Sequence, residues 1–195
     1  MIKTSQMLYE ELSEYSEPAN KIMRMVKEGT IIPIIQGKYE TEKNIPGYYL
    51  APVIYGPSYL SFDFALAWHS LIPEAVYTFT SATCMKGRRK EFTNFYGTYT
   101  YRDVPKDVFP LEVNLITENG YSFFIASAEK ALCDKLSTLP PCGNRTELRE
   151  LMFEDLRIDE AAFRNLNYQT LADLSDMYRM TNLKLLGKMI RSLSK

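Results

Sequence analysis

Residues 111–136 read LEVNLITENGYSFFIASAEKALCDKL, and this stretch indicates the kind of fold that the chain adopts. Two runs of mixed apolar and polar residues flank Asn119-Gly120, a dipeptide that favours a two-residue turn between antiparallel strands. Ser127 then stands where a helix N-cap is expected, and apolar residues follow it at helical spacing. The stretch therefore predicts a β-hairpin followed directly by an α-helix that ends before Pro140.

The segments upstream of this hairpin extend the sheet. The runs AVYTFTSAT (75–83) and FTNFYGTYTYRDV (92–104) are rich in β-branched and aromatic residues, which predicts further strands. The run YYLAPVIYGPSYLS (48–61) predicts another strand and a turn at Gly56-Pro57. Residues 62–72 then predict a helix that is apolar on nearly every side and should be buried. A mixed sheet of about five strands results.

Polar residues on these two helices are expected to have structural roles. His69 is the only histidine, so it has no second imidazole with which to share a metal or a proton relay, and we expect an ordinary hydrogen bond. On the later helix, Glu129, Lys130, Asp134 and Lys135 have the spacing of surface ion pairs.

The C-terminal third predicts four short helices, with caps at Thr146, Asp159, Thr170 and Asn182. Residues 146–160 carry a net charge of −4, whereas residues 182–195 carry +4. The basic residues of the last helix recur every three or four positions and predict one basic face: Lys184, Lys188, Arg191 and Lys195. This face could contact DNA, an acidic partner protein, or the acidic helix of its own chain.

The first 43 residues predict two helices followed by two short strands around residues 36–38, which is the order of a reduced winged helix. Polar and basic residues lie opposite the apolar face of Ile22, Met23 and Val26 on the second helix. The predicted DNA-binding residues of this unit are Asn20, Lys21, Arg24, Lys27 and, on the wing, Lys38. The alternative for such a stripe is a solvated helix face.

A second concentration of positive charge follows the strand at 75–83. Within 19 residues, the five cations outweigh Glu91 by four charges: Lys86, Arg88, Arg89, Lys90 and Arg102. A patch of this kind is typical of a surface that contacts nucleic acid or an acidic partner. A solvated hairpin loop is the alternative.

The composition excludes several classes of function. The chain has 195 residues, a formal net charge of −1 and a sequence pI near 6.0, so any phosphate-binding face has to be local. The three cysteines are widely spaced without a C-x-x-C pair and only one histidine is present, so no structural zinc site is expected, and no other metal or cofactor either. The acidic N-terminus and the lack of any apolar run of about 18 residues predict a cytoplasmic protein without membrane contact.

An enzymatic function is not expected either. The chain has no P-loop, no glycine-rich dinucleotide fingerprint and no nucleotidyltransferase motif. Asp107 and Glu112 are placed like the carboxylates of nuclease-like folds, but Asn114 stands where such a motif has lysine.

Three motifs occur in a characteristic order: YYLAPVIYGPSYLSFDFALAWHSLIPEAVYTFTSAT from residue 48, KGRRKEF…YGTYTYRDV from residue 86, and ASAEKALCDKL from residue 126. In this order the chain resembles the AbiEi antitoxin family of abortive-infection toxin–antitoxin pairs, over about residues 25–140. The resemblance implies a winged-helix unit that represses its own operon and a second domain that neutralises a nucleotidyltransferase-like toxin.

The expected fold is therefore α+β, with a winged-helix-like unit over residues 1–43 and, over residues 44–195, a mixed β-sheet domain closed by C-terminal helices. The expected function is that of an antitoxin and transcriptional autoregulator, with promoter DNA and the cognate toxin as partners. The alternative is a protein-interaction module of antitoxin-like fold that does not bind DNA.

Overall fold

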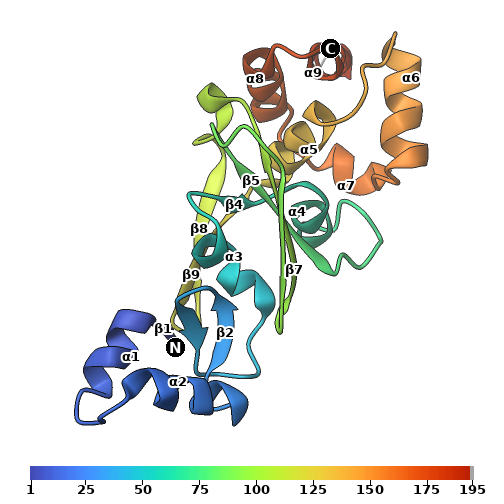
Figure 1. Ribbon diagram of the computed structural model, residues 1–195. Helices are drawn as coiled ribbons and strands as arrows, with labels where there is room; N and C mark the ends of the chain where they lie inside the picture. The colour runs from blue at the N-terminus through green and yellow to red at the C-terminus, as the bar shows by residue number, and fades with distance from the viewer. Residues whose placement is uncertain (194–195) are drawn as a thin grey trace.

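A computed structural model describes residues 1–193 of the chain, and it shows an α+β protein with a small N-terminal unit and a larger mixed-sheet domain (Figure 1). Within residues 1–43, three short antiparallel strands in the order β1-β3-β2 accompany two helices. The elements are β1 (Ile2–Thr4), α1 (Ser5–Glu11), α2 (Pro18–Lys27), β2 (Ile32–Ile35) and β3 (Lys38–Glu40). The order helix, helix, hairpin agrees with the expected one, and β1 adds a strand that the sequence did not indicate.

The N-terminal unit has a small core of its own. Its buried members come from both helices, from the end cap of α1 and from the residue before β2: Leu8, Leu12, Ile22 and Ile31. Met23 was expected on this apolar face, but its side chain is 69% exposed. The half-buried Met25 and Val26 take its place, because residues three and four positions after Ile22 share its side of the helix.

The main domain contains, among the described residues, a six-stranded sheet in the order β6-β7-β5-β4-β9-β8. Parallel and antiparallel pairs alternate along it. The strands are β4 (Tyr59–Leu60), β5 (Thr78–Thr83), β6 (Lys90–Asn94), β7 (Gly97–Asp103), β8 (Val113–Glu118) and β9 (Tyr121–Ala126). The hairpin turn at Asn119-Gly120 is confirmed, since it joins β8 to β9.

The strand predicted after residue 48 is wrong, because residues 47–54 are helical. Gly47–Leu50 form a 3-10 turn, η1, and Ala51–Ile54 form α3. The buried hydroxyl of Tyr99 donates to the Gly47 carbonyl (3.0 Å), and that of Tyr101 donates to the Ala51 carbonyl (2.8 Å). These bonds come from a strand about 50 residues away, so local β-propensity was overridden by tertiary contacts.

The remaining helices pack on the sheet and at its end. They are α4 (Phe62–Trp68), η2 (Lys106–Val108), α5 (Ala128–Ser137), α6 (Arg145–Glu150) with the π-turn η3 (Leu151–Asp155), α7 (Glu160–Arg164), α8 (Tyr168–Tyr178) and α9 (Thr181–Leu193). Helix α4 is largely buried as predicted, although Trp68 at its end is 38% exposed. None of the helices within residues 1–193 has the length and apolar character that crossing a bilayer requires.

The capping residues were predicted with mixed success. Ser127 and Asp159 accept hydrogen bonds from the first turns of α5 and α7, as expected. Asn144 and Asn167 cap α6 and α8, so the predicted caps two or three residues later were wrong. The asparagine side chains reach the backbone amides two or three positions onward, which favours a cap at those earlier positions.

The N-terminal unit lies at one end of the molecule, and the C-terminal helices lie at the other (Figure 1). Side chains and backbone join the unit to the main sheet. Asn94 donates to the Ile34 carbonyl (3.0 Å), and Tyr96 donates to the Glu42 carbonyl (2.8 Å). Ile34 itself belongs to the core of the main domain. These contacts join β2 and the segment after β3 to the main sheet, and α2 packs within the same unit through Ile22.

A buried polar cluster lies between β4, α5 and α8, where surface ion pairs were expected. The Lys130 ammonium lies 3.0 Å from the Asp134 carboxylate, and both side chains are fully buried. Tyr59 (2.9 Å) and Ser61 (2.7 Å) donate to the other carboxylate oxygen, and Tyr178 also donates to this carboxylate. The prediction of a surface pair was wrong here, because β4 and α8 cover this side of α5.

Candidate functional site

Helix α2 presents three basic side chains and no acidic one within its ten residues. Arg24 and Lys27 are exposed and form no ion pair with any residue of the described range. Lys21 is half-buried, with its ammonium 5.6 Å from the centre of the Tyr15 ring. The Asn20 amide donates to Glu17. Four of the five residues predicted for DNA binding in this unit therefore share one helix whose other side is buried through Ile22.

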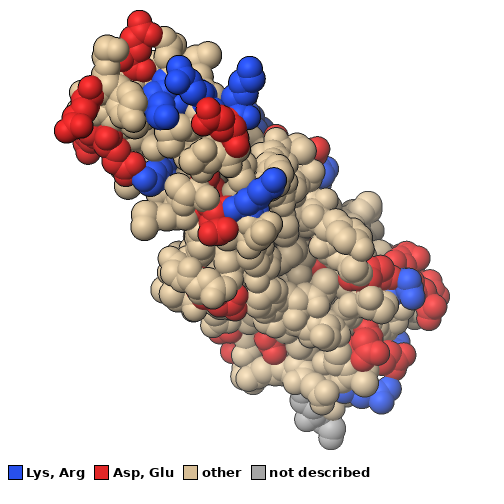
Figure 2. Space-filling model, turned by 90° about the horizontal axis from the view of Figure 1, so that it is seen from below, with Lys and Arg blue, Asp and Glu red and all other residues tan. Residues whose placement is uncertain are grey.

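Acidic side chains surround this basic face. Residues 1–43 contain seven glutamates and six lysines or arginines. One ion pair forms at the end of α1, where the Lys3 ammonium lies 2.5 Å from the Glu11 carboxylate. Blue side chains gather over the N-terminal unit in Figure 2, with red ones beside them. The unit carries no excess of positive charge as a whole, so the unpaired cations of α2 form a local basic face.

Lys38, the predicted wing residue, occupies a different environment. It begins β3, and its ammonium donates to the Val53 carbonyl of the main domain (2.8 Å). The hydrogen bond directs this charge to the junction between the unit and the sheet. The structure thus separates Lys38 from the face formed by α2.

The basic stretch after β5 is an ordered crossover loop. Asp103, at the end of β7, accepts hydrogen bonds from Thr83 and from the backbone amides of Lys86 and Gly87, each at 2.7 Å. Burial raises the pKa of Asp103, but these hydrogen bonds outweigh it, and the net pKa lies below the usual value. The loop over residues 84–89 is therefore anchored by a carboxylate that stays ionised at neutral pH.

The five predicted basic residues of this region do not form one patch. The Lys86 ammonium donates to the Gly56 carbonyl (3.0 Å) and lies 5.1 Å from the centre of the Tyr55 ring. Lys90 is half-buried in β6 opposite Tyr101. Arg88 is exposed. Only Arg89 and Arg102 come together, at a pocket of about 220 Å³.

A third cation completes this pocket, and the sequence did not indicate it. Lys135 comes from the last turn of α5, and its ammonium lies 2.6 Å from the Asp63 carboxylate at the start of α4. Its separation of more than 30 residues from Arg102 leaves no spacing signal that could have revealed it. The topology alone places it there.

The basic face of α9 is partly engaged within the chain. Lys184 and Lys188 are exposed without an ion pair among residues 1–193, opposite the buried Leu186 and Ile190. Arg191 lies 2.5 Å from Asp176 of α8. An acidic helix of the same chain thus takes one of the predicted contacts, although it is α8 and not the segment 146–160. Lys195 lies outside the described residues.

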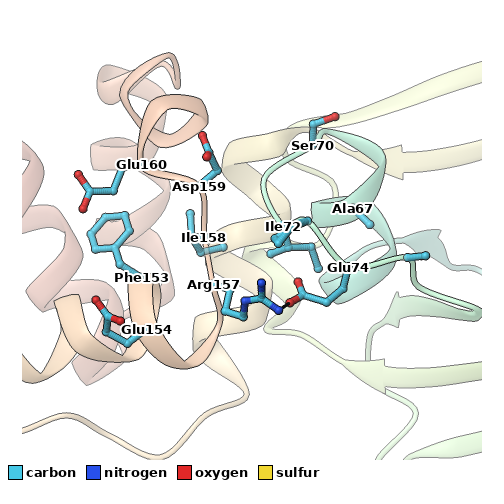
Figure 3. Close-up of a pocket in the computed structure, with 12 residues that line it drawn as sticks. Ala67, Ser70, Ile72, Glu74, Phe153, Glu154, Arg157, Ile158, Asp159 and Glu160 are labelled. Carbon is cyan, nitrogen blue, oxygen red and sulfur yellow. Dashed lines mark ion pairs between the residues drawn. The ribbon is translucent and has the colours of Figure 1, made fainter.

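A broad open cleft of about 950 Å³ separates the loop after α4 from residues 153–160 (Figure 3). Arg157 forms an ion pair with Glu74 across it. Glu154 and Glu160 lie on either side of the Phe153 ring in the close-up. The cleft combines excess carboxylates with an apolar floor, which suits a basic protein segment better than a nucleic acid.

His69, the only histidine of the chain, has an ordinary structural contact. The imidazole of His69 is hydrogen-bonded to the Ala126 carbonyl through Nε2 (2.8 Å), which confirms the expected structural hydrogen bond. Within residues 1–193, no group of three or more His, Cys, Asp or Glu side chains is placed to hold a metal ion.

Comparison with known proteins adds no further evidence, since no family model and no curated protein matches the chain. The resemblance to AbiEi antitoxins therefore stays a prediction from the sequence motifs. The geometry described above carries the functional argument.

Proposed function

We propose that this protein is an AbiEi-type antitoxin and transcriptional autoregulator, which binds its own promoter through α2 and neutralises a nucleotidyltransferase-like toxin through the main domain. It acts by binding and not by catalysis. The observation that carries the proposal is the outward face of α2, where Arg24 and Lys27 are exposed and form no ion pair within residues 1–193.

The residue types on this face suit a DNA major groove. Arginine and lysine contact phosphates or guanine, and Asn20 can bond to adenine in two places when its amide is released from Glu17. Met23 is exposed at the edge of this face, where an apolar side chain can contact a thymine methyl group. The ten-residue length of α2 is enough to occupy the groove over about two to three turns of helix.

Replacing Lys21, Arg24 and Lys27 together with Ala is expected to weaken promoter binding by at least about tenfold at 0.1 M salt. Three lost phosphate contacts would also reduce the slope of log K against log salt by about 2.7. Fluorescence anisotropy with labelled promoter DNA at several salt concentrations measures both. A matched variant that loses three exposed cations elsewhere, at Lys43, Lys106 and Arg145, should keep most of the slope. Equal losses in the two variants, or no promoter binding by the unaltered protein, would contradict the repressor role.

The acidic cleft supports the second half of the proposal, because it offers a basic partner both carboxylates and apolar area. Reversing two of its charges with Glu154→Lys and Glu160→Lys should abolish protection against the toxin encoded by the neighbouring gene, as measured by growth on toxin induction. The control reverses two exposed carboxylates outside the cleft, Glu91→Lys and Asp107→Lys. Protection that survives the cleft variant would move the toxin contact elsewhere.

The two experiments also separate the alternative function. A protein that protects cells but shows no salt-dependent promoter binding is an interaction module without DNA binding. Both assays use the full chain. Ile34 of the N-terminal unit is part of the core of the main domain, so a fragment without this unit would expose that core.

A further inference from the structure

The pocket that contains Arg89 and Arg102 lies on one face of the main sheet. Tyr99 and Tyr101 point toward η1 and α3, since their hydroxyls donate to the carbonyls of Gly47 and Ala51. Side chains alternate along a strand, so Thr100 and Arg102 project from the opposite face. The first turn of α4 and the end of α5 border the space above them, which is partly open to solvent, and no lining residue belongs to the N-terminal unit.

The charges in this pocket are not balanced by the protein. Three cations line it, and the one carboxylate among the lining residues is Asp63, which is 39% exposed and pairs with Lys135. Arg89 and Arg102 form no ion pair with any residue from 1 to 193. Both arginine side chains are exposed to solvent, and an anion bound between these two like charges would be attracted by both.

The pocket is also built rather than accidental. The loop that carries Arg89 is fixed by Asp103, which accepts hydrogen bonds from the amides of Lys86 and Gly87 at 2.7 Å. Arg102 stands on a central strand that pairs on both sides. The Thr100 hydroxyl, in the same pocket, makes no hydrogen bond with the described chain and is available to a ligand.

We propose that this pocket binds the phosphate group of a small phosphorylated molecule. Arginine presents a planar fork of donors that matches two phosphate oxygens at once, and two such forks with an ammonium form a typical phosphate site. The volume of about 220 Å³ accommodates a phosphate or a diphosphate, and it is smaller than the roughly 300–1,000 Å³ of drug-sized pockets. The site is independent of the proposed contact between α2 and DNA.

Pyrophosphate and inorganic phosphate are the probes, titrated by calorimetry against the full chain at constant ionic strength set with chloride. We expect saturable binding and a rise in the melting temperature with pyrophosphate. Arg89→Gln and Arg102→Gln should each raise the dissociation constant by about tenfold or more, because each removes a charge-assisted hydrogen bond. Arg88→Gln is the matched control: it removes the neighbouring arginine, which does not line the pocket, and should change affinity by less than about twofold.

Asp63→Asn should act in the opposite direction and tighten pyrophosphate binding several-fold, since it removes the competing carboxylate and frees Lys135. In the absence of ligand, the melting temperature of Arg102→Gln should be no lower than that of the unaltered protein. If Arg102 had only a structural role, its replacement would lower this temperature.

The proposal is overturned if pyrophosphate does not bind at about 10 mM, or if Arg88→Gln loses as much affinity for pyrophosphate as Arg102→Gln. The Ala variant of Lys21, Arg24 and Lys27 should bind pyrophosphate normally, so failure of the repressor role leaves this result intact. Loss of promoter affinity in Arg102→Gln without pyrophosphate binding would instead overturn the small ligand and assign the pocket to nucleic-acid phosphates.

Discussion

Replacing Asp134 with Ala is expected to lower the free energy of unfolding by about 3–5 kcal/mol, the usual loss when one partner of a buried ion pair is removed. The Lys130 ammonium would then be left in the core without a counter-charge. Burial already lowers the pKa of Lys130, against the attraction of Asp134. Tyr59 and Ser61 would lose the oxygen to which they donate. Since a domain of this size is stable by only about 5–15 kcal/mol, the loss is a large fraction of the total.

Urea unfolding followed by circular dichroism measures this loss. The double variant Lys130→Met with Asp134→Leu should be less destabilised than Asp134→Ala alone, because it buries no unpaired charge. Glu11→Ala, which breaks the partly exposed pair with Lys3, should cost less than about 1 kcal/mol. The loss of stability in the double variant is compared with the losses in Lys130→Met alone and Asp134→Leu alone. If the two single losses simply add up to the loss in the double variant, the coupling inferred from the geometry is wrong.

Asn182→Ala is expected to cost about 2–4 kcal/mol, because it leaves buried backbone groups without partners. The side-chain oxygen of Asn182 accepts a hydrogen bond from the backbone amide of Cys142 (2.8 Å). The side-chain amide of Asn182 donates to the backbone carbonyls of Leu136 (3.2 Å) and Pro140 (2.9 Å). One side chain of α9 thus satisfies the C-terminal end of α5 and the turn after it. The side chain is buried, so water cannot replace these bonds.

Asn144→Ala provides the comparison for this prediction. Asn144 also bonds to backbone amides, but it caps the exposed start of α6, where solvent can replace it. Removal of such a cap typically costs about 1 kcal/mol. Equal losses of stability in the two variants, measured by thermal unfolding, would show that Asn182 acts only as a local cap.

The local elements of this protein could be predicted from the sequence because short-range chemistry decides them. The Asn119-Gly120 turn, the Ser127 cap and the one-sided charge of α2 each depend on residues within about four positions of one another. Turn conformation, capping and helical periodicity act at that range, so the printed order of residues already contains them.

Only the tertiary structure decided where polar groups meet across the sheet. Residues 47–54 are helical because the hydroxyls of Tyr99 and Tyr101 bond to their backbone, against the β-propensity of that segment. Lys130 and Asp134 are buried because two distant elements cover α5. Lys135 joins the two arginines of the pocket from a different helix. Long-range pairing brings these groups together. The periodicity of the sequence indicates which face of a helix or strand is apolar, but it does not tell which distant element packs on that face.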